Sequence, residues 1–289
     1  MSSEHRTLLE LLPAQGPGHP ARRRATIGTE DSSRYLSIVV PAYNEERRLP
    51  QTLLRIAAYL RQRAYAATVL VVDDGSSDST ASVVEEFAAD DPAVRLIRNE
   101  HRGKAYAVRT GMLAAEGRYV LFTDADGATP IEEADKLLHY LEEGYDVAIA
   151  SREGLGARRF NEPWHRHLMG RAFNLMVRCI ALRGIQDTQC GFKAFRREAA
   201  RDLFGHMLLY GSGAKAVRGS LLTGFDVEIL FLARKWGYRI AEVPVHWYYG
   251  ADSKVSAVKD SWRNLRDVVR VRCNDLQGRY PRDRGARSQ

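Results

Sequence analysis

Short continuous runs of apolar residues alternate with amphipathic segments along the first half of the chain. The runs are LSIVVPA, TVLVVDD, AVRLIRN, RYVLFTDAD and DVAIAS, and they show no period of two, as is typical of strands buried on both faces. The segments between them, such as LPQTLLRIAAYLRQRA and GKAYAVRTGMLAAE, have apolar residues at helical spacing. This alternation predicts an α/β fold with a mostly parallel central sheet flanked by helices.

Polar residues gather where each predicted strand ends. The first four strands are followed by PAYNEE, DDGSSDST, NEHRGK and DADGATP, and the fifth by SRE. Ligands of such sheets bind at the carboxyl ends of the strands, which meet at one edge. The pattern therefore predicts a single binding site along that edge.

The totals narrow the class of partner. The chain has 289 residues and a formal net charge of +7, which favours nucleotides, phosphates or acidic lipid surfaces. No nucleic-acid-binding motif is present, so we expect no nucleic acid partner. The glycine patterns GxGxxG and GxxxxGK[ST] and the zinc motif HExxH are absent too, which removes the main support for dehydrogenases, P-loop enzymes and zinc proteases.

Cysteine usage and hydropathy bear on the compartment. Cys179, Cys190 and Cys273 lack metal-ligand spacing, and their odd number argues against a disulfide framework, so a reducing cytoplasm fits. No apolar run approaches the ~18 residues of a membrane-spanning helix. The N-terminal LLELL is too short for a signal peptide.

The triplet DAD places Asp124 and Asp126 directly after a predicted buried strand. Hard carboxylate oxygens suit Mg²⁺ or Mn²⁺, with substrate phosphates completing the coordination shell. The alternative is an ordinary loop that caps a helix. A similar choice exists for Asp73 and Asp74, because DDGSSDST would also turn the chain and cap a helix through Asp78.

Several motifs in a fixed order carry a resemblance to a known family. The segments SIVVPAYNEE, VLVVDDGSSDST, RGKAYAVRTGM, FTDADGATP and DTQCGFKAF resemble the inverting family 2 glycosyltransferases, which have the GT-A fold. Within that family the set is similar to polyprenyl- and dolichyl-phosphate sugar transferases, including the mannose synthases. DTQCGFK, FDVEIL and EVPVHW are most similar to the dolichyl-phosphate β-glucosyltransferases.

The resemblance covers about residues 36–275 and implies a domain plan. It implies one GT-A domain, 35–276, with a Rossmann-like nucleotide-sugar half at 35–150 and an acceptor half at 151–276. Residues 1–34 are rich in Gly, Pro, Arg and Ser and are expected to be a disordered basic tail. Residues 277–289 are expected to be a flexible basic tail.

The family's site residues map onto this sequence by motif. The resemblance implies that the donor nucleotide is bound by Pro41, Ala42, Tyr43, Glu45, Asp73, Asp74, Gly103, Lys104, Asp124 and Ala125. It further implies that the metal is held by Asp124 and Asp126, that the donor sugar is met by Gln189, that the acceptor phosphate is met by Ser151 and Arg152, and that catalysis depends on Asp126, Asp187 and Arg152. Asp226 and Glu228 in FDVEIL fit either the site or the acidic first turn of a helix.

The implied reaction moves a hexose, glucose by resemblance, from a UDP-sugar to a polyprenyl or dolichyl phosphate with inversion and a Mg²⁺ or Mn²⁺ ion. A donor such as GDP-mannose or a soluble acceptor remains open. A noncatalytic nucleotide-sugar or membrane-surface binding protein is an alternative of another class, although binding alone would not require the aspartate pair. The sequence leaves the oligomeric state open.

Segment 163–183 has the composition of an amphipathic helix. Pro163 suits a first turn, and the apolar half of the helical wheel begins at Trp164 and is bordered by arginines. An ordinary packed helix has the same periodicity, and the resemblance favours an interface helix. We therefore expect a cytoplasmic protein that is peripherally associated with the cytoplasmic face of the membrane.

Overall fold

A computed structural model of the chain describes residues 34–163, 170–171, 176–177, 180–182, 184–211, 213, 224–250 and 257–281; within 257–263 it describes the backbone alone. All of them belong to one compact unit, Ser32–Gln289. The expected tail 1–34 lies outside the described residues except for Arg34.

The described elements alternate as predicted in the first half of the chain. The strands are β1 (Leu36–Ala42), β2 (Ala67–Asp73), β3 (Val94–Arg98), β4 (Tyr119–Thr123), β5 (Val147–Ser151), β6 (Arg158–Phe160), β7 (Phe192–Arg196), β8 (Ile240–Pro244) and β9 (His246–Tyr248). The helices are α2 (Leu49–Arg61), α3 (Thr80–Asp90), α4 (Lys104–Ala114), the 3₁₀ turn η1 (Ile131–Glu133), α5 (Ala134–Glu142), α7 (Arg197–Gly205), α8 (Phe225–Lys235) and α9 (Ala257–Leu276).

The central sheet has the strand order β3-β2-β1-β4-β7-β5-β8, and β6 pairs with β9 in a small second sheet. All neighbours in the central sheet are parallel except β7, which runs antiparallel to both β4 and β5. The prediction of a mostly parallel sheet is confirmed. The fourth and fifth strands of the sequence are not neighbours, however, because β7 lies between them and contributes its own amino end to the edge where their carboxyl ends meet.

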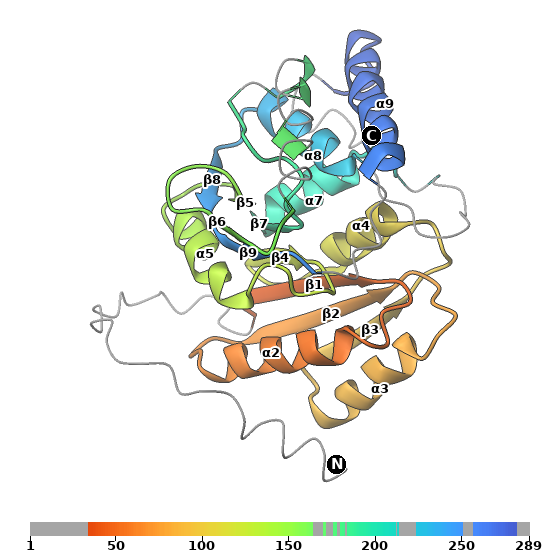
Figure 1. The fold of residues 1–289 in the computed structure, drawn as a ribbon, viewed down its shortest axis with the longest axis vertical. Helices are drawn as coiled ribbons and strands as arrows, with labels where there is room; N and C mark the ends of the chain where they lie inside the picture. Colours follow the sequence, from red (N-terminus) through yellow and green to blue (C-terminus); the bar gives the residue numbers. More distant parts are fainter. Residues whose placement is uncertain are drawn as a thin grey trace. The chain divides into compact units, whose positions relative to one another are not determined.

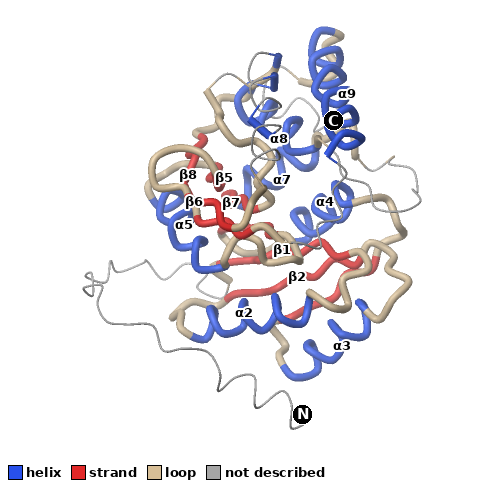
Figure 2. Tube along the Cα trace, in the orientation of Figure 1, coloured by secondary structure: helices blue, strands red, loops and turns tan. Residues whose placement is uncertain are grey.

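Helices cover both faces of this sheet (Figures 1 and 2). On one face, α2, α3 and α5 pack against side chains such as Ile38 and Val40. On the other face, α4, α7 and α8 pack against side chains such as Val39 and Phe122, and α9 packs on α8. Burial on both faces explains why the strands read as continuous apolar runs rather than as alternating ones.

The predicted boundary of the C-terminal tail at 276 is wrong. Tyr280 is only 1% exposed, and its hydroxyl donates a hydrogen bond of 2.8 Å to Glu228. The indole Nε1 of Trp236 donates to the carbonyl of Pro281 over 3.0 Å. The folded domain therefore extends at least to residue 281. The polar composition of the last residues gave no sign that Tyr280 is buried.

The predicted interface helix, 163–183, falls mostly outside the described residues. Among its described side chains, Met176 is 39% exposed and Ile180 is 36% exposed, whereas Val177 and Leu182 are buried. No helix within the described residues has the length and apolar composition needed to cross a bilayer.

Candidate functional site

The polar segments that follow β1, β2, β3, β4 and β5 lie at one edge of the sheet, as predicted, because these strands run in the same direction. The segment before β7 joins them there. Two groups of charged side chains occupy this edge. We call the group around Asp124 the carboxylate cluster and the group around Asp187 the Arg152 network.

The carboxylate cluster is built on a fixed loop after β4. The carbonyl of Ala125 accepts a hydrogen bond of 2.8 Å from Thr52 Oγ1 of α2, and Asp126 Oδ1 accepts one of 3.0 Å from the amide of Ala128. Gly127 has a φ of +61°, a conformation that favours glycine. Ala125 is buried and Asp126 is exposed, so the loop presents the second carboxylate outward.

Asp124 is held by a cation on one side and by bare backbone on the other. Lys104 Nζ, from the first residue of α4, lies 2.6 Å from Asp124 Oδ1. A Cβ atom placed on Gly191 would lie 2.2 Å from Asp124 Oδ2, so the carboxylate rests where only glycine leaves room. This explains why a glycine precedes β7 in the segment TQCGF.

The electrostatics of the cluster favour a bound cation. Burial alone would lower the pKa of Lys104, but attraction to Asp124 outweighs it and raises that pKa above its ordinary value. Asp126 is exposed, yet neighbouring protein atoms displace part of its water, and this desolvation together with repulsion from Asp124 raises the pKa of Asp126. A divalent ion between the two carboxylates would relieve that repulsion.

The donor set fits Mg²⁺ or Mn²⁺. Among the described residues, no group of three or more His, Cys, Asp or Glu side chains is placed to hold a metal ion. Two carboxylates are nevertheless what these ions usually take from a protein when substrate phosphates supply further oxygen ligands.

Another ion pair, this one buried, lies on β7 and α8, and its charges interact with those of the cluster. Lys193 Nζ lies 2.6 Å from Asp226 Oδ1 and donates a 2.5 Å hydrogen bond to the carbonyl of Cys190. Burial raises the pKa of Asp226 in spite of Lys193, and the charges of Lys104 and Asp124 also act on it. Asp226 is therefore more than an acidic residue at a helix start.

The residues expected at the nucleotide contribute mainly to the shape of the edge. Asp74 is 1% exposed, and its carboxylate accepts hydrogen bonds from the amides of Arg102 (3.0 Å) and Gly103 (2.8 Å). Asp73 Oδ1 accepts one of 3.1 Å from the amide of Ser76. The Asp74 contacts fix the turn that starts α4 at Lys104, where Gly103 has a φ of +94°, and the Asp73 contact fixes the loop after β2.

The remaining residues of the predicted nucleotide site lie at the end of β1 and in the loop after it. Pro41 and Ala42 are buried in the strand. The ring of Tyr43 stacks on His101 with centroids 3.9 Å apart and an angle of 3°. Glu45 forms an ion pair of 2.5 Å with Arg48. His101 was not among the residues predicted for the nucleotide site. Its position directly after β3, at the same edge of the sheet, is the sequence signal that could have identified it.

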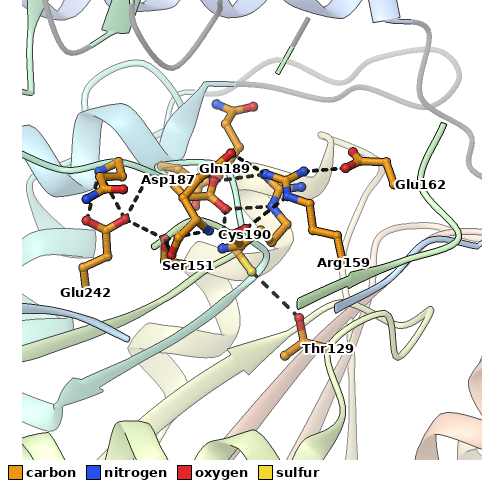
Figure 3. A network of polar contacts seen from close by, with 12 residues as sticks. Thr129, Ser151, Arg159, Glu162, Asp187, Gln189, Cys190 and Glu242 are labelled. Carbon is orange, nitrogen blue, oxygen red and sulfur yellow. Dashed lines mark hydrogen bonds and ion pairs between the residues drawn. The ribbon is translucent and has the colours of Figure 1, made fainter. Parts of the chain in front are cut away.

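The Arg152 network joins the residues predicted for the acceptor (Figure 3). Arg152 grips Asp187 with Nε at 2.7 Å and Nη2 at 2.9 Å, and its backbone amide donates to the same carboxylate. Ser151 Oγ donates to Glu242 Oε1 over 2.7 Å. Glu242 also accepts from the amides of Gln186 and Asp187, at 2.9 Å and 2.8 Å. The structure thus brings these residues together by binding them to one another.

The surroundings of Asp187 favour its ionised form. Its side chain is 0% exposed. Burial alone would raise the pKa of Asp187, but the Arg152 guanidinium outweighs burial and holds that pKa well below its usual range. Gln189 lies two residues further along the chain, and its backbone amide donates a hydrogen bond of 3.1 Å to Asp187 Oδ1.

Comparisons with known proteins agree on one family. A family model described as Glycosyl transferase family 2 matches residues 37–204. The dolichyl-phosphate beta-glucosyltransferase of Dictyostelium discoideum is 35% identical over 261 residues, which are 84% of this chain and 76% of the relative. The human protein of the same name is 34% identical over 269 residues, 87% of this chain and 79% of the relative.

Solved structures share the architecture at lower sequence identity. Mannosyl-3-phosphoglycerate synthase from Rubrobacter xylanophilus matches with a TM-score of 0.61 and 21% identity, covering 85% of this chain and 76% of its own. Glucosyl-3-phosphoglycerate synthase from Mycobacterium tuberculosis, in complex with Mn²⁺, UDP-glucose and phosphoglyceric acid, matches with a TM-score of 0.56 and 20% identity over 83% and 80% of the two chains.

Proposed function

The chain belongs to glycosyl transferase family 2 and is an inverting glycosyltransferase with the GT-A fold, and on this premise we propose that it transfers glucose from UDP-glucose to a dolichyl or polyprenyl phosphate. The names of the relatives support the sugar and the lipid acceptor. The single observation that carries the proposal for the donor is the carboxylate cluster, with Lys104 at 2.6 Å from Asp124 beside an exposed Asp126.

The donor diphosphate would bind at this cluster. Lys104 can exchange its contact with Asp124 for one with a phosphate oxygen, while Asp124 and Asp126 would hold Mg²⁺ or Mn²⁺. When bound, such an ion supplies neutralisation of the negative charge on the diphosphate. Tyr43, the loop held by Asp73 and the turn held by Asp74 line the same edge and would receive the nucleoside.

The reaction would be a direct displacement. An oxygen of the acceptor phosphate forms a bond to the anomeric carbon, the bond from that carbon to the diphosphate breaks, and its electron pair leaves with UDP. A phosphate is already anionic near neutral pH, so the protein needs no strong general base. Positioning and neutralisation of charge would supply the rate enhancement.

Arg152 and Asp187 would serve this reaction by position. The guanidinium of Arg152 is engaged by Asp187, so a phosphate at Ser151 and Arg152 would share an existing ion pair rather than meet a free cation. The network would fix the segment that ends at Gly191, against which Asp124 rests.

A membrane surface would deliver the lipid acceptor. Exposed Met176 and Ile180, four residues apart, are the described members of the predicted apolar half-wheel of 163–183. Together with the net charge of +7, they support peripheral binding to the cytoplasmic face of a membrane with anionic lipids.

The test is a transfer assay with radiolabelled UDP-glucose and dolichyl or decaprenyl phosphate, with Mn²⁺ and with a chelator. Metal-dependent label in the organic phase is the expected result. Label in the aqueous phase, obtained with a phosphorylated soluble acceptor, would mean that the acceptor is soluble and not a lipid. Labelled lipid from GDP-mannose but not from UDP-glucose would mean that the donor is GDP-mannose. No transfer from any nucleotide sugar would contradict the proposal altogether.

A further inference from the structure

Two side-chain amides meet beside the Arg152 network, and among the described residues two of their four polar atoms have no hydrogen-bond partner. Asn264 Nδ2, on α9, donates a hydrogen bond of 3.2 Å to Gln189 Oε1. Gln189 Nε2 and Asn264 Oδ1 are both buried, and within the described part of the chain neither has a hydrogen-bond partner. Asn264 as a whole is only 8% exposed.

This leaves one unpaired donor atom on Gln189 and one unpaired acceptor atom on Asn264. Rotating both amides by 180° reverses the bond between them and again leaves one donor and one acceptor. Folded proteins rarely leave buried polar atoms without a partner, because removing them from water is unfavourable unless something replaces the water. The pair is therefore a candidate for contact with a ligand.

The pair lies close to the proposed place of the donor diphosphate. Gln189 is two residues before Gly191, whose backbone touches the carboxylate of Asp124. Two residues of chain span at most about 7 Å, which is comparable to the width of a hexose ring. A sugar attached to a diphosphate at Asp124 and Asp126 would thus be within reach of Gln189.

α9 is fixed in the position that brings Asn264 to this point. One turn further along, Asp267 Oδ2 accepts hydrogen bonds from Tyr210 (2.5 Å) and from the amide of Gly224 (3.2 Å). A Cβ on Gly224 would lie 3.2 Å from the Cβ of Asp267, so the helix passes directly over the glycine. These contacts hold the helix where Asn264 meets Gln189.

We propose that Asn264, paired with Gln189, binds one hydroxyl group of the donor hexose and contributes to the choice of sugar. A hydroxyl accepts one hydrogen bond and donates another, so it matches the free amide hydrogen and the free amide oxygen at once. A site built in this way discriminates against a sugar that lacks the hydroxyl, because the buried amides would again be left without partners. This inference rests on the proposed function for the location of the diphosphate.

The test compares the affinities of the full-length protein for UDP-glucose and for UDP by calorimetry in the presence of Mn²⁺. Asn264→Ala should weaken UDP-glucose binding about ten-fold and leave UDP binding unchanged. Asn274→Ala, ten residues later on the same helix, is the matched control and should change neither. Gln189→Met removes the other half of the pair outside the helix, and it should reproduce the selective loss if Asn264→Ala proves unstable.

Deoxy analogues of the donor identify the hydroxyl. The wild-type protein should lose about ten-fold in affinity for the one analogue that lacks it, and Asn264→Ala should show no further loss with that analogue. Equal losses for UDP and UDP-glucose in both variants, or no loss in either, would overturn the inference and leave a structural or water-filled pair. If the wild-type protein binds another nucleotide sugar instead, the proposed donor is wrong, and the same comparison is made with that sugar and its nucleotide.

Discussion

The carboxylate cluster and the Arg152 network lie at the same edge of the sheet and differ in how their charges are compensated. In the first, Lys104 lies 2.6 Å from Asp124, the charges of Lys104 and Arg48 act on Asp126 from further away, and Asp126 is exposed. In the second, Asp187 is 0% exposed and accepts a two-pronged contact from Arg152 together with two backbone amides. The cluster has a surplus of negative charge, and the Asp187–Arg152 pair is neutral.

This difference in charge compensation suggests different roles, ligand binding for the cluster and structural support for the network. A surplus of charge at a rim is relieved by a ligand of opposite sign, whereas a neutral, buried ion pair gains little from one. This contrast supports the proposal that the metal ion and the diphosphate bind at the carboxylate cluster. The network holds the segment 187–191 in place. This segment carries the side chain of Gln189 and Gly191, against which the Asp124 carboxylate packs.

The largest effect is expected from Asp126→Ala, which removes the exposed carboxylate of the cluster. Turnover should fall about 1,000-fold, and stimulation by Mn²⁺ should disappear, because the charge on the departing diphosphate would lose its compensation. Transfer assays across a Mn²⁺ titration measure this. Asp90→Ala, at the exposed end of α3, is the control and should keep full activity. Metal-stimulated turnover at the wild-type rate in Asp126→Ala would remove the cluster from the mechanism.

Asp187→Asn should act on stability before it acts on chemistry. It leaves Arg152 without its counter-charge in a buried site, and the free energy of unfolding should drop by about 3 kcal/mol in urea titrations. Glu85→Gln is the control, because it breaks an ion pair with Arg98 in which both side chains are more than half exposed. It should change the free energy of unfolding by less than ~0.5 kcal/mol.

The pH dependence of the same variant gives a second measurement. The pKa of Asp187 is depressed in the folded protein, so its stabilisation is present above the ordinary aspartate pKa of about 3.9 and is lost as the pH falls toward the folded value. The stability gap between the wild-type protein and Asp187→Asn should therefore narrow below about pH 4. A gap that stays constant down to pH 2 would mean that the ion pair does not stabilise the fold.

A smaller effect is expected from Gly191→Ala. The new methyl group would overlap Asp124 Oδ2 and displace the carboxylate, so Mn²⁺ affinity measured with UDP should weaken about ten-fold. Gly205→Ala is the matched control, because nothing lies within 4 Å of a Cβ there. Unchanged Mn²⁺ affinity in Gly191→Ala would show that Asp124 is not a ligand.

The first half of the fold was predictable from the sequence because its signals are local. Strands buried on both faces give continuous apolar runs, and polar residues directly after each run identified the edge that carries the site. The family predicted from the ordered motifs is confirmed as well.

The second half depends on contacts between distant segments, which leave weak local signals. β7 reads as FKAFR, and a lysine at its second position makes a buried strand hard to recognise. The charge of that lysine is matched by Asp226, more than thirty residues later. On α9, Asn264 and Asp267 share a buried face with Val268 and Val271, at helical spacing. Polar residues on an otherwise apolar face were the available sequence signal for the amide pair.

The antiparallel insertion of β7 also sets an order for folding. As the chain leaves the ribosome, β1 to β4 can pair with one another, but one edge of β4 has no neighbour until residues 192–196 have been made. β5 waits for the same five residues, because its contact with the first four strands runs through them. Closing the sheet thus requires a contact across about seventy residues, a slow step of the kind that leaves an open strand edge exposed to aggregation during synthesis.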